Sequence, residues 1–171
     1  EFLSNGGIRA LSKYYQQNPY SLDFNGSHYS IQYDPGDSTS NMFGGNSNWR
    51  GPVWMPLNFL FIHAIKIFGY FFEDNYKVEC PKGSGNYLTL TEVATEITNR
   101  LLNIFEKNKQ NERLVNGPYN WFYQREENRD LVLFHEYFHG DNLRGLGAGH
   151  QTGWTALVVN LIYNMKNQSM I

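Results

Sequence analysis

The stretch from Val53 to Phe72, Val-Trp-Met-Pro-Leu-Asn-Phe-Leu-Phe-Ile-His-Ala-Ile-Lys-Ile-Phe-Gly-Tyr-Phe-Phe, is the most apolar part of the chain. It predicts a helix with apolar side chains on nearly every side, and such a helix is expected to be surrounded by protein. Four residues interrupt the apolar run: Pro56, Asn58, His63 and Lys66. We therefore interpret this stretch as a buried helix and not as a membrane span.

Further helices follow from the pattern of apolar residues. Thr89 and Glu92 form a capping-box pattern, and apolar residues at helical spacing continue from there to Phe105. This helix has a single apolar stripe, so its other face is expected to meet water. A last helix begins near Trp154 and presents one apolar face. A short helix is also expected within residues 8–17.

Residues 20–33 read as two strands with Asn25-Gly26 between them, a dipeptide that favours a tight turn. We expect a small β-hairpin here, inserted into an otherwise mainly α chain. The order of a fully apolar helix, an amphipathic helix and long loops predicts part of a toroid of helical hairpins. Three or four helices cannot close such a ring, so residues 1–171 are expected to be part of one larger domain.

Composition narrows the possible functions. The 171 residues suffice for one domain with a sizeable core, and the formal net charge is -2 with a pI of about 6.2. We therefore expect neither a nucleic-acid partner nor an anionic membrane. Cys80 is the only cysteine, which excludes an intrachain disulfide and a zinc site built from cysteines. Aromatic residues make up 16% of the chain, enough to fill a core or to stack on a flat ligand.

Two loops combine glycine with Trp, Arg, His, Gln and carboxylate side chains, and each leads into a predicted helix. They are residues 44–54 and residues 136–154. Polar side chains gathered at helix starts favour a pocket at one end of a helical domain. Sugars fit this mixture, because pyranose rings offer apolar faces to aromatic rings and hydroxyls to polar side chains. Cleavage of a glycosidic bond needs two carboxyl groups, and Glu136 is the candidate for one of them.

Other interpretations of these loops stay open on the residues alone. A zinc site that includes His135, Glu136 and His139 would need a helix, which Gly140 interrupts. The run Gly145–Gly149 is not followed by the Lys and Ser/Thr of a phosphate-binding loop. Glu136 itself could be a structural carboxylate held by hydrogen bonds.

Several motifs decide between these interpretations. They are Glu1-Phe2-Leu3-Ser4 with Gly7-Ile8-Arg9, Met42-Phe43-Gly44-Gly45-Asn46-Ser47-Asn48-Trp49-Arg50-Gly51-Pro52-Val53-Trp54, Lys77-Val78-Glu79-Cys80-Pro81, Glu136-Tyr137-Phe138-His139-Gly140-Asp141 and His150-Gln151-Thr152-Gly153-Trp154-Thr155. Together they resemble the C-terminal part of glycoside hydrolase family 63, the family of processing α-glucosidase I. The resemblance spans essentially the whole chain, and within the family the chain looks most similar to a branch found in bacteria and fungi.

The resemblance implies an (α/α)6 barrel that hydrolyses α-glucosidic bonds with inversion and needs no cofactor or metal. It places the general base at Glu136. It places these residues at the sugar: Trp49, Arg50, Trp54, His150 and Gln151. The partners that it implies are an α-glucoside or oligosaccharide substrate and the remainder of the same catalytic domain.

The general acid is expected before residue 1, because Asp141, the nearby carboxylate, is expected to order its own loop. The chain alone should then be inactive. Ala148-Gly149-His150 and Leu143-Arg144 depart from the family pattern and leave the exact substrate open. The alternative is a non-catalytic carbohydrate-binding or regulatory descendant of the same fold, and a purely structural helical domain is a third possibility.

Localisation follows from weaker signals. The N-terminus shows no signal peptide and the chain has one cysteine, which favours the cytoplasm. The glycosylation triplets Asn25-Gly26-Ser27 and Asn167-Gln168-Ser169 leave the lumen of the endoplasmic reticulum as the alternative.

Overall fold

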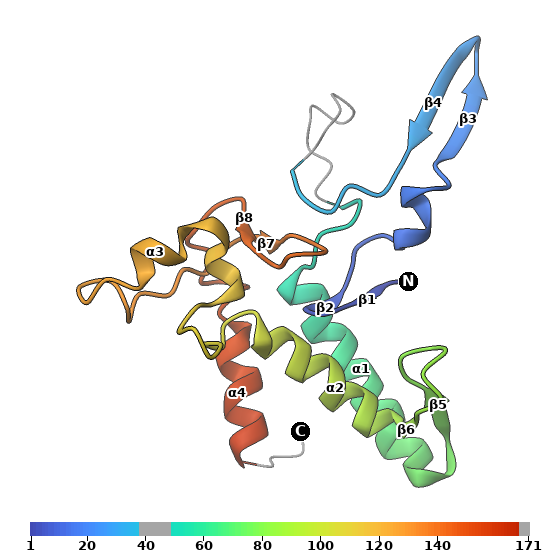
Figure 1. The fold of residues 1–171 in the computed structure, drawn as a ribbon. Coiled ribbons are helices and arrows are strands. Elements are labelled where there is room, and N and C mark those ends of the chain that lie inside the picture. Colours follow the sequence, from blue (N-terminus) through green and yellow to red (C-terminus); the bar gives the residue numbers. More distant parts are fainter. Residues whose placement is uncertain (38–48, 168–171) are drawn as a thin grey trace.

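The computed structural model describes residues 1–37 and 49–167 (Figure 1). Its central group consists of three helices, α1 (Met55–Phe72), α2 (Leu90–Asn103) and α4 (Leu157–Asn167). α1 packs against α2, and α4 contacts both. Buried side chains from these helices and from the loops beside them form the core, among them Val53, Met55, Ile62, Ile97, Leu101, Phe138, Val158 and Leu161.

The strands of the described residues form antiparallel pairs of two strands each. The pairs are β1 (Leu3–Ser4) with β2 (Gly7–Ile8), β3 (Tyr20–Phe24) with β4 (Ser27–Ile31), β5 (Lys77–Glu79) with β6 (Tyr87–Thr89), and β7 (Tyr137–Phe138) with β8 (Gly145–Leu146). Short helical segments lie between them: η1 (Lys13–Gln16), η3 (Glu73–Asn75), η4 (Leu114–Tyr119) and α3 (Asn120–Tyr123).

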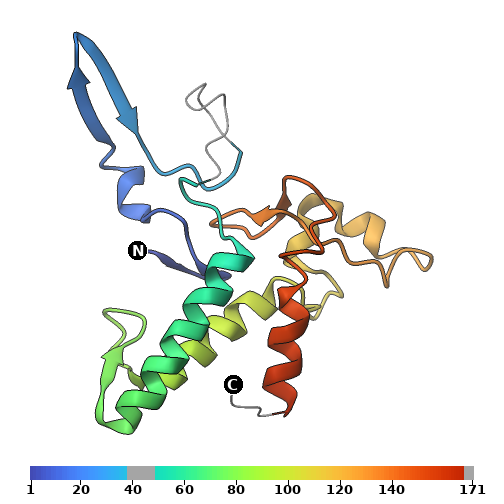
Figure 2. The same cartoon turned by 180° about the vertical axis from the view of Figure 1, so that it is seen from behind.

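The expected (α/α)6 barrel is wrong for the part of the chain that the structure describes. The long helices pack as one small group and do not form successive hairpins around a centre (Figures 1 and 2). Residues 104–156, which connect α2 to α4, hold short turns and one strand pair but no further long helix. Apolar runs in this connection, such as Leu131–Phe134, lie outside any helix, so apolar character there does not indicate helix.

The helix α1 is far more exposed than its composition predicts, and the prediction of a helix surrounded by protein is wrong here. It buries Met55, Asn58, Ile62 and Gly69. Its open side carries Leu57, Leu60, Phe61, Ile67, Phe68, Tyr70 and Phe71. The segment Met55–Asn75 is long and apolar enough to cross a membrane: its most apolar 18 residues have a mean hydropathy of 1.4, and 22% of them are buried. The core helix of a soluble protein can pass the same test, so length and composition do not distinguish the two.

The asparagine inside this apolar helix has a structural reason. Asn58 is buried, and its Oδ1 accepts from the Ile8 backbone N at 2.7 Å while its Nδ2 donates to the Ile8 carbonyl at 3.0 Å. A buried amide is tolerated when its donors and acceptors are satisfied. Gly7 adopts φ 116°, and a Cβ there would lie 2.7 Å from Asn58 Oδ1. Asn58 therefore fixes the N-terminal strand pair to α1, and Gly7 permits the close approach.

The amphipathic helix α2 confirms the sequence prediction. Thr89 Oγ1 accepts from the Glu92 backbone N at 3.2 Å, and Glu92 Oε2 accepts from the Thr89 backbone N at 2.7 Å. This reciprocal pair satisfies two backbone donors that a helix start leaves without partners. The apolar stripe is buried against the core, with Val93, Ala94, Ile97, Leu101 and Leu102.

The hairpin of β3 and β4 is present with the turn that Asn25-Gly26 predicts. Asn25 has φ 48° and Gly26 has φ 75°, the left-handed conformations that a two-residue hairpin turn requires. The hairpin projects away from the helices in both views (Figures 1 and 2). The short helix expected within residues 8–17 is present as the four-residue 3-10 helix η1, Lys13–Gln16. It is shorter than the predicted range, because Ile8 belongs to β2 and pairs back onto Leu3.

Candidate functional site

The two motif-bearing loops meet at Val53 and Phe138. The Val53 backbone N donates to the Phe138 carbonyl at 2.8 Å, and the Phe138 backbone N donates to the Val53 carbonyl at 2.9 Å. Both residues are fully buried. This bridge lies directly before α1, and it places Trp54 beside Tyr137, the neighbour of Glu136 in sequence. The first motif enters the described region at Trp49; its residues 42–48 lie outside it.

A cluster of aromatic rings surrounds Trp54. Trp49 stacks on it with ring centroids 4.3 Å apart and planes 2° apart, and Tyr137 stacks on it at 5.0 Å and 24°. Trp154 meets it edge-on at 5.5 Å. Trp54 is 3% exposed, whereas Trp49 is 54% exposed. Of the two tryptophans predicted at the sugar, Trp54 is thus the buried support and Trp49 offers the accessible ring.

Glu136 is partly buried at the edge of this ring cluster. Its Oε2 accepts from the Ala148 backbone N at 3.2 Å, and its backbone carbonyl accepts from Trp154 Nε1 at 3.1 Å. Gly147 has φ 67°, and a Cβ there would lie 2.6 Å from Glu136 Oε2. Glycine is therefore required where the backbone passes the carboxylate. One backbone amide orients the group and leaves it with acceptor capacity for a water molecule or a sugar hydroxyl.

Arg50 lies in the interior next to Asp34. Its Nη2 is 3.0 Å from Asp34 Oδ2, and the two side chains are 9% and 6% exposed. The Asp34 backbone N also donates to the Arg50 carbonyl at 2.7 Å. Sequence reasoning missed Asp34. In this chain the Arg50 guanidinium is directed at a carboxylate of the protein, so a direct contact with sugar stays a prediction.

His150 and Gln151 lie on the turn that precedes α4. His150 is exposed and Gln151 is half-buried. The Gln151 backbone N donates to the Phe134 carbonyl at 2.7 Å, and its carbonyl accepts from the Thr155 backbone N at 2.9 Å. The backbone of Gln151 thus fastens the start of α4 to the segment that carries Glu136. The roles of both side chains stay predictions, because no contact of the described residues tests them.

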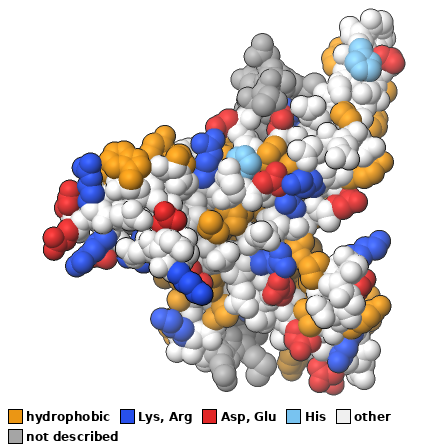
Figure 3. All heavy atoms as spheres, in the orientation of Figure 1, with side chains coloured by type: hydrophobic (Ala, Val, Ile, Leu, Met, Phe, Trp, Pro, Cys, Tyr) orange, Lys and Arg blue, Asp and Glu red, His pale blue; other side chains and the backbone are white. Residues whose placement is uncertain are grey.

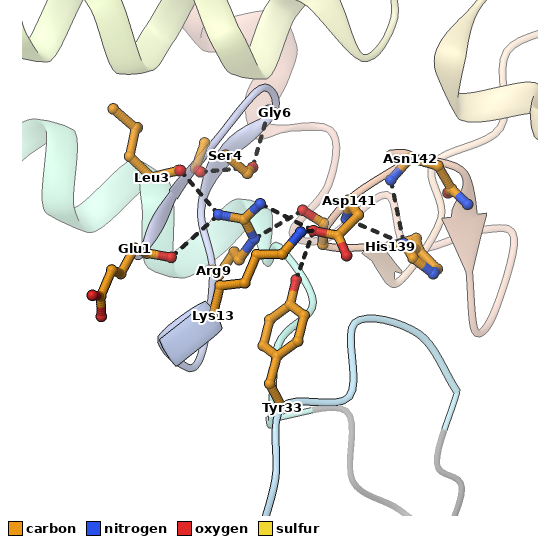
Figure 4. A network of polar contacts seen from close by, with 12 residues as sticks. Glu1, Leu3, Ser4, Gly6, Arg9, Lys13, Tyr33, His139, Asp141 and Asn142 are labelled. Atoms are coloured by element: carbon orange, nitrogen blue, oxygen red, sulfur yellow. Dashed lines mark hydrogen bonds and ion pairs between the residues drawn. The ribbon is translucent and has the colours of Figure 1, made fainter. Parts of the chain in front are cut away.

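Asp141 orders its loop, as the sequence predicted. Its Oδ1 accepts from Arg9 Nη2, Lys13 Nζ and the Tyr33 hydroxyl, each at 3.0 Å (Figure 4). Burial alone would raise the pKa of Asp141, but the three donors outweigh it and hold this pKa below its usual value. A carboxyl with a lowered pKa is ionised at neutral pH, so Asp141 is poorly suited to act as a general acid.

His135 and His139, on either side of Glu136, are both partly buried. His139 Nδ1 accepts from the backbone N of Asp141 at 3.1 Å, and burial lowers the pKa values of His139 and His135. Within residues 1–37 and 49–167, no group of three or more His, Cys, Asp or Glu side chains is placed to hold a metal ion.

Asp37 is a second carboxylate at the ring cluster, and sequence reasoning did not identify it. The Tyr137 hydroxyl donates to Asp37 Oδ1 at 3.1 Å. Burial raises the pKa of Tyr137 to about 12, with further contributions from the negative charges of Asp37 and Glu136. The Arg144 guanidinium lies 3.9 Å from Asp37 Oδ2. Asp37 lies in the polar loop that begins at Asp34, and the polarity of that loop is the one sequence signal that could have identified it.

Glu136 lines neither of two cavities found in the described residues. One of about 600 Å³ runs along α2 and is lined mainly by asparagine and charged side chains, among them Asn5, Asn99, Arg100, Asn103 and Asn142. One of about 200 Å³ lies at η4 and α3 and includes Tyr119, Tyr123 and His135. Trp49 is instead exposed, and Glu136 is partly exposed.

Comparison with known proteins gives a distant relationship to a glucosidase. No family model matches the chain. It is 49% identical over 164 residues to an uncharacterized protein of Saccharomyces cerevisiae, an alignment that covers 95% of this chain and 15% of that protein. It is 30% identical over 121 residues to mannosyl-oligosaccharide glucosidase of the same yeast, covering 70% of this chain and 11% of the glucosidase. The chain therefore spans a small part of the length of each relative.

Proposed function

We propose that this chain supplies the general base and part of the sugar pocket of an inverting glycoside hydrolase of family 63 that acts on α-glucosides. The observation that carries the proposal is the position of Glu136 at the edge of the ring cluster around Trp54. Its carboxylate accepts a hydrogen bond from the Ala148 backbone N, and its backbone carbonyl accepts one from Trp154 Nε1. The similarity to a glucosidase over 70% of the chain supports the class of reaction.

The proposed chemistry uses Glu136 as a base. An inverting glycosidase needs a carboxylate that removes a proton from water while a second carboxyl group protonates the glycosidic oxygen on the other side of the sugar. Glu136 keeps acceptor capacity for that water, because its described donor is the single Ala148 amide. Asp141 accepts hydrogen bonds from three donors and is poorly suited to donate a proton. The general acid is therefore assigned to a part of the full-length protein outside this chain.

Sugar binding is assigned to the accessible side of the ring cluster. The exposed ring of Trp49, supported by Trp54, provides a flat apolar surface for one face of a pyranose. His150 and Gln151 lie on the turn that leads to Trp154, where they can reach hydroxyl groups. Arg50 acts through the loop, because its ion pair with Asp34 fixes the backbone directly after Trp49. The reaction needs no cofactor.

The remainder of a larger catalytic domain is proposed to cover the open side of α1. Large apolar side chains stay exposed along that side, including Leu60, Ile67, Tyr70 and Phe71. A soluble protein rarely leaves so much apolar surface uncovered on one face. The relatives are much longer than this chain, which supports additional protein as the covering partner. Activity is therefore to be measured on the full-length protein that contains this chain.

The test replaces the proposed base by its uncharged isostere. Glu136→Gln in the full-length protein should lower kcat for an α-glucoside by at least about 100-fold, the usual contribution of a general base. Glu127→Gln, an exposed glutamate on another loop, is the matched control and should retain the activity of the original protein. Equal activity of the two variants would contradict the assignment of Glu136. Sugar binding without hydrolysis in the unsubstituted protein would favour a non-catalytic carbohydrate-binding descendant.

A further inference from the structure

The peptide unit that precedes Glu136 is held at both of its polar groups. Its carbonyl, which belongs to His135, accepts a hydrogen bond from the Thr155 hydroxyl. Its N–H, which belongs to Glu136, donates to the Ala148 carbonyl at 2.8 Å. The C=O and N–H of a planar trans peptide point in opposite directions, so these two partners together fix the orientation of the peptide plane.

The peptide unit that follows Glu136 is held as well. Its carbonyl accepts from Trp154 Nε1 at 3.1 Å, and the next residue, Tyr137, pairs with Leu146 between β7 and β8. The two backbone dihedral angles of Glu136 are the rotations between these two peptide planes. Fixing both planes therefore fixes the direction in which the Glu136 side chain leaves the backbone. The Ala148 backbone N then holds the carboxylate, at 3.2 Å from Oε2.

Thr155 is the one fully buried side chain among these donors. It is 0% exposed, whereas Trp154 is partly exposed and contacts the ring cluster. A hydroxyl has one proton to donate, and Thr155 donates it to a carbonyl 20 positions earlier in the chain, although α4 begins two residues later. Because Thr155 is enclosed by protein, it does not touch a sugar. An effect of Thr155 on a reaction at Glu136 must therefore pass through the segment that its hydroxyl holds.

We infer that Thr155 is a positioning residue for the Glu136 carboxylate. Its hydroxyl holds the His135 carbonyl and thereby keeps the carboxylate in the orientation in which it faces its water. A general base acts only within hydrogen-bond reach of the proton that it removes, and a displacement of about 1 Å can lower a rate by about 100-fold. This inference rests on the proposed function, because it concerns the base of the same reaction.

The test removes the hydroxyl and keeps the shape of the side chain in the full-length protein. Thr155→Val should lower kcat for an α-glucoside by about 10- to 100-fold and leave KM nearly unchanged, because Thr155 does not touch the substrate. Thr155→Ser keeps the hydroxyl and should retain most of kcat. The matched control is Thr98→Val: Thr98 is 2% exposed and donates to the Ala94 carbonyl at 2.8 Å within α2. It should lose stability in the same way and keep kcat.

A double substitution separates positioning from a general loss of stability. Adding Thr155→Val to Glu136→Gln should lower the residual rate little further, because both changes act through the same carboxylate. If Thr155→Val does not fold, Thr155→Ala takes its place in every comparison.

Three results would overturn the inference while Glu136→Gln alone stays inactive and the role of Glu136 stands. They are a kcat in Thr155→Val equal to that in Thr98→Val, a loss in Thr155→Ser as large as in Thr155→Val, and full additivity in the double variant. Undiminished activity of Glu136→Gln would instead overturn the proposed function, and the inference with it.

Discussion

The hairpin of β3 and β4 and the junction of the two motif-bearing loops each contain an aspartate paired with a basic side chain, in opposite surroundings. In the hairpin, Asp23 and His28 lie 2.7 Å apart with side chains 84% and 62% exposed. At the junction, Asp34 and Arg50 lie 3.0 Å apart and are almost completely buried. The hairpin is held by its own strands and turn, whereas the junction is held by contacts between distant parts of the chain. The candidate site lies at the junction, which depends on contacts between distant parts of the chain.

The largest expected effect comes from the same substitution in the two regions. Asp34→Asn breaks the buried ion pair with Arg50 by removing one of its two charges, and it should lower the free energy of unfolding by about 3 to 5 kcal/mol. Asp23→Asn in the exposed pair should change it by less than about 1 kcal/mol. Denaturant unfolding of both variants measures the difference. Similar losses at the two positions would break the distinction between the regions.

A glycine comparison should give a smaller effect. A Cβ on Gly140 would lie 2.5 Å from the Gly51 carbonyl oxygen and 2.6 Å from the Tyr33 hydroxyl, so Gly140→Ala should cost about 2 to 3 kcal/mol through forced displacement of packed atoms. Gly26→Ala in the hairpin meets no atom within 4 Å and should cost about 1 kcal/mol, from its positive φ alone. Thermal unfolding compares the two variants. A larger loss at Gly26 would show that the junction is not tightly packed.

The smallest of these effects depends on pH. The pKa of Asp141 is lower in the folded protein than in the unfolded chain, so its contribution to stability is present above the unfolded pKa and is lost as pH falls through the folded pKa. At pH 7, Asp141→Asn should cost about 1 to 2 kcal/mol. The difference from the original protein should shrink as pH falls below about 4, the pKa of an aspartate in the unfolded chain. A difference that stays constant over this range would contradict an ionised Asp141.

Local patterns predicted local structure well. The capping box at Thr89 and Glu92 and the turn at Asn25-Gly26 involve residues within three positions of each other, and both formed as expected. The architecture was predicted wrongly, because a barrel requires that many helices pack around a ring, whereas residues 104–156 form no long helix. Spacing along the sequence carries little information about such packing.

In the candidate site, too, local motifs were recognised from the sequence and long-range contacts were not. The motifs pointed to the two loops and to Glu136, yet the pairing of Val53 with Phe138 and the contact of Tyr137 with Asp37 join residues 85 and 100 positions apart. Hydrogen bonds over such separations leave no periodic trace in the sequence. The ring cluster around Trp54 was missed for the same reason, and it now distinguishes a supporting tryptophan from an accessible one.

The central claim is that Glu136 activates water on the face of the sugar opposite the leaving group. Proton NMR of the full-length protein acting on an α-glucoside tests it most directly, because it shows which anomer of glucose appears before mutarotation. The account predicts that β-glucose appears first and that Glu136→Gln releases neither anomer at a comparable rate. Initial release of α-glucose, or undiminished hydrolysis by Glu136→Gln, would contradict it.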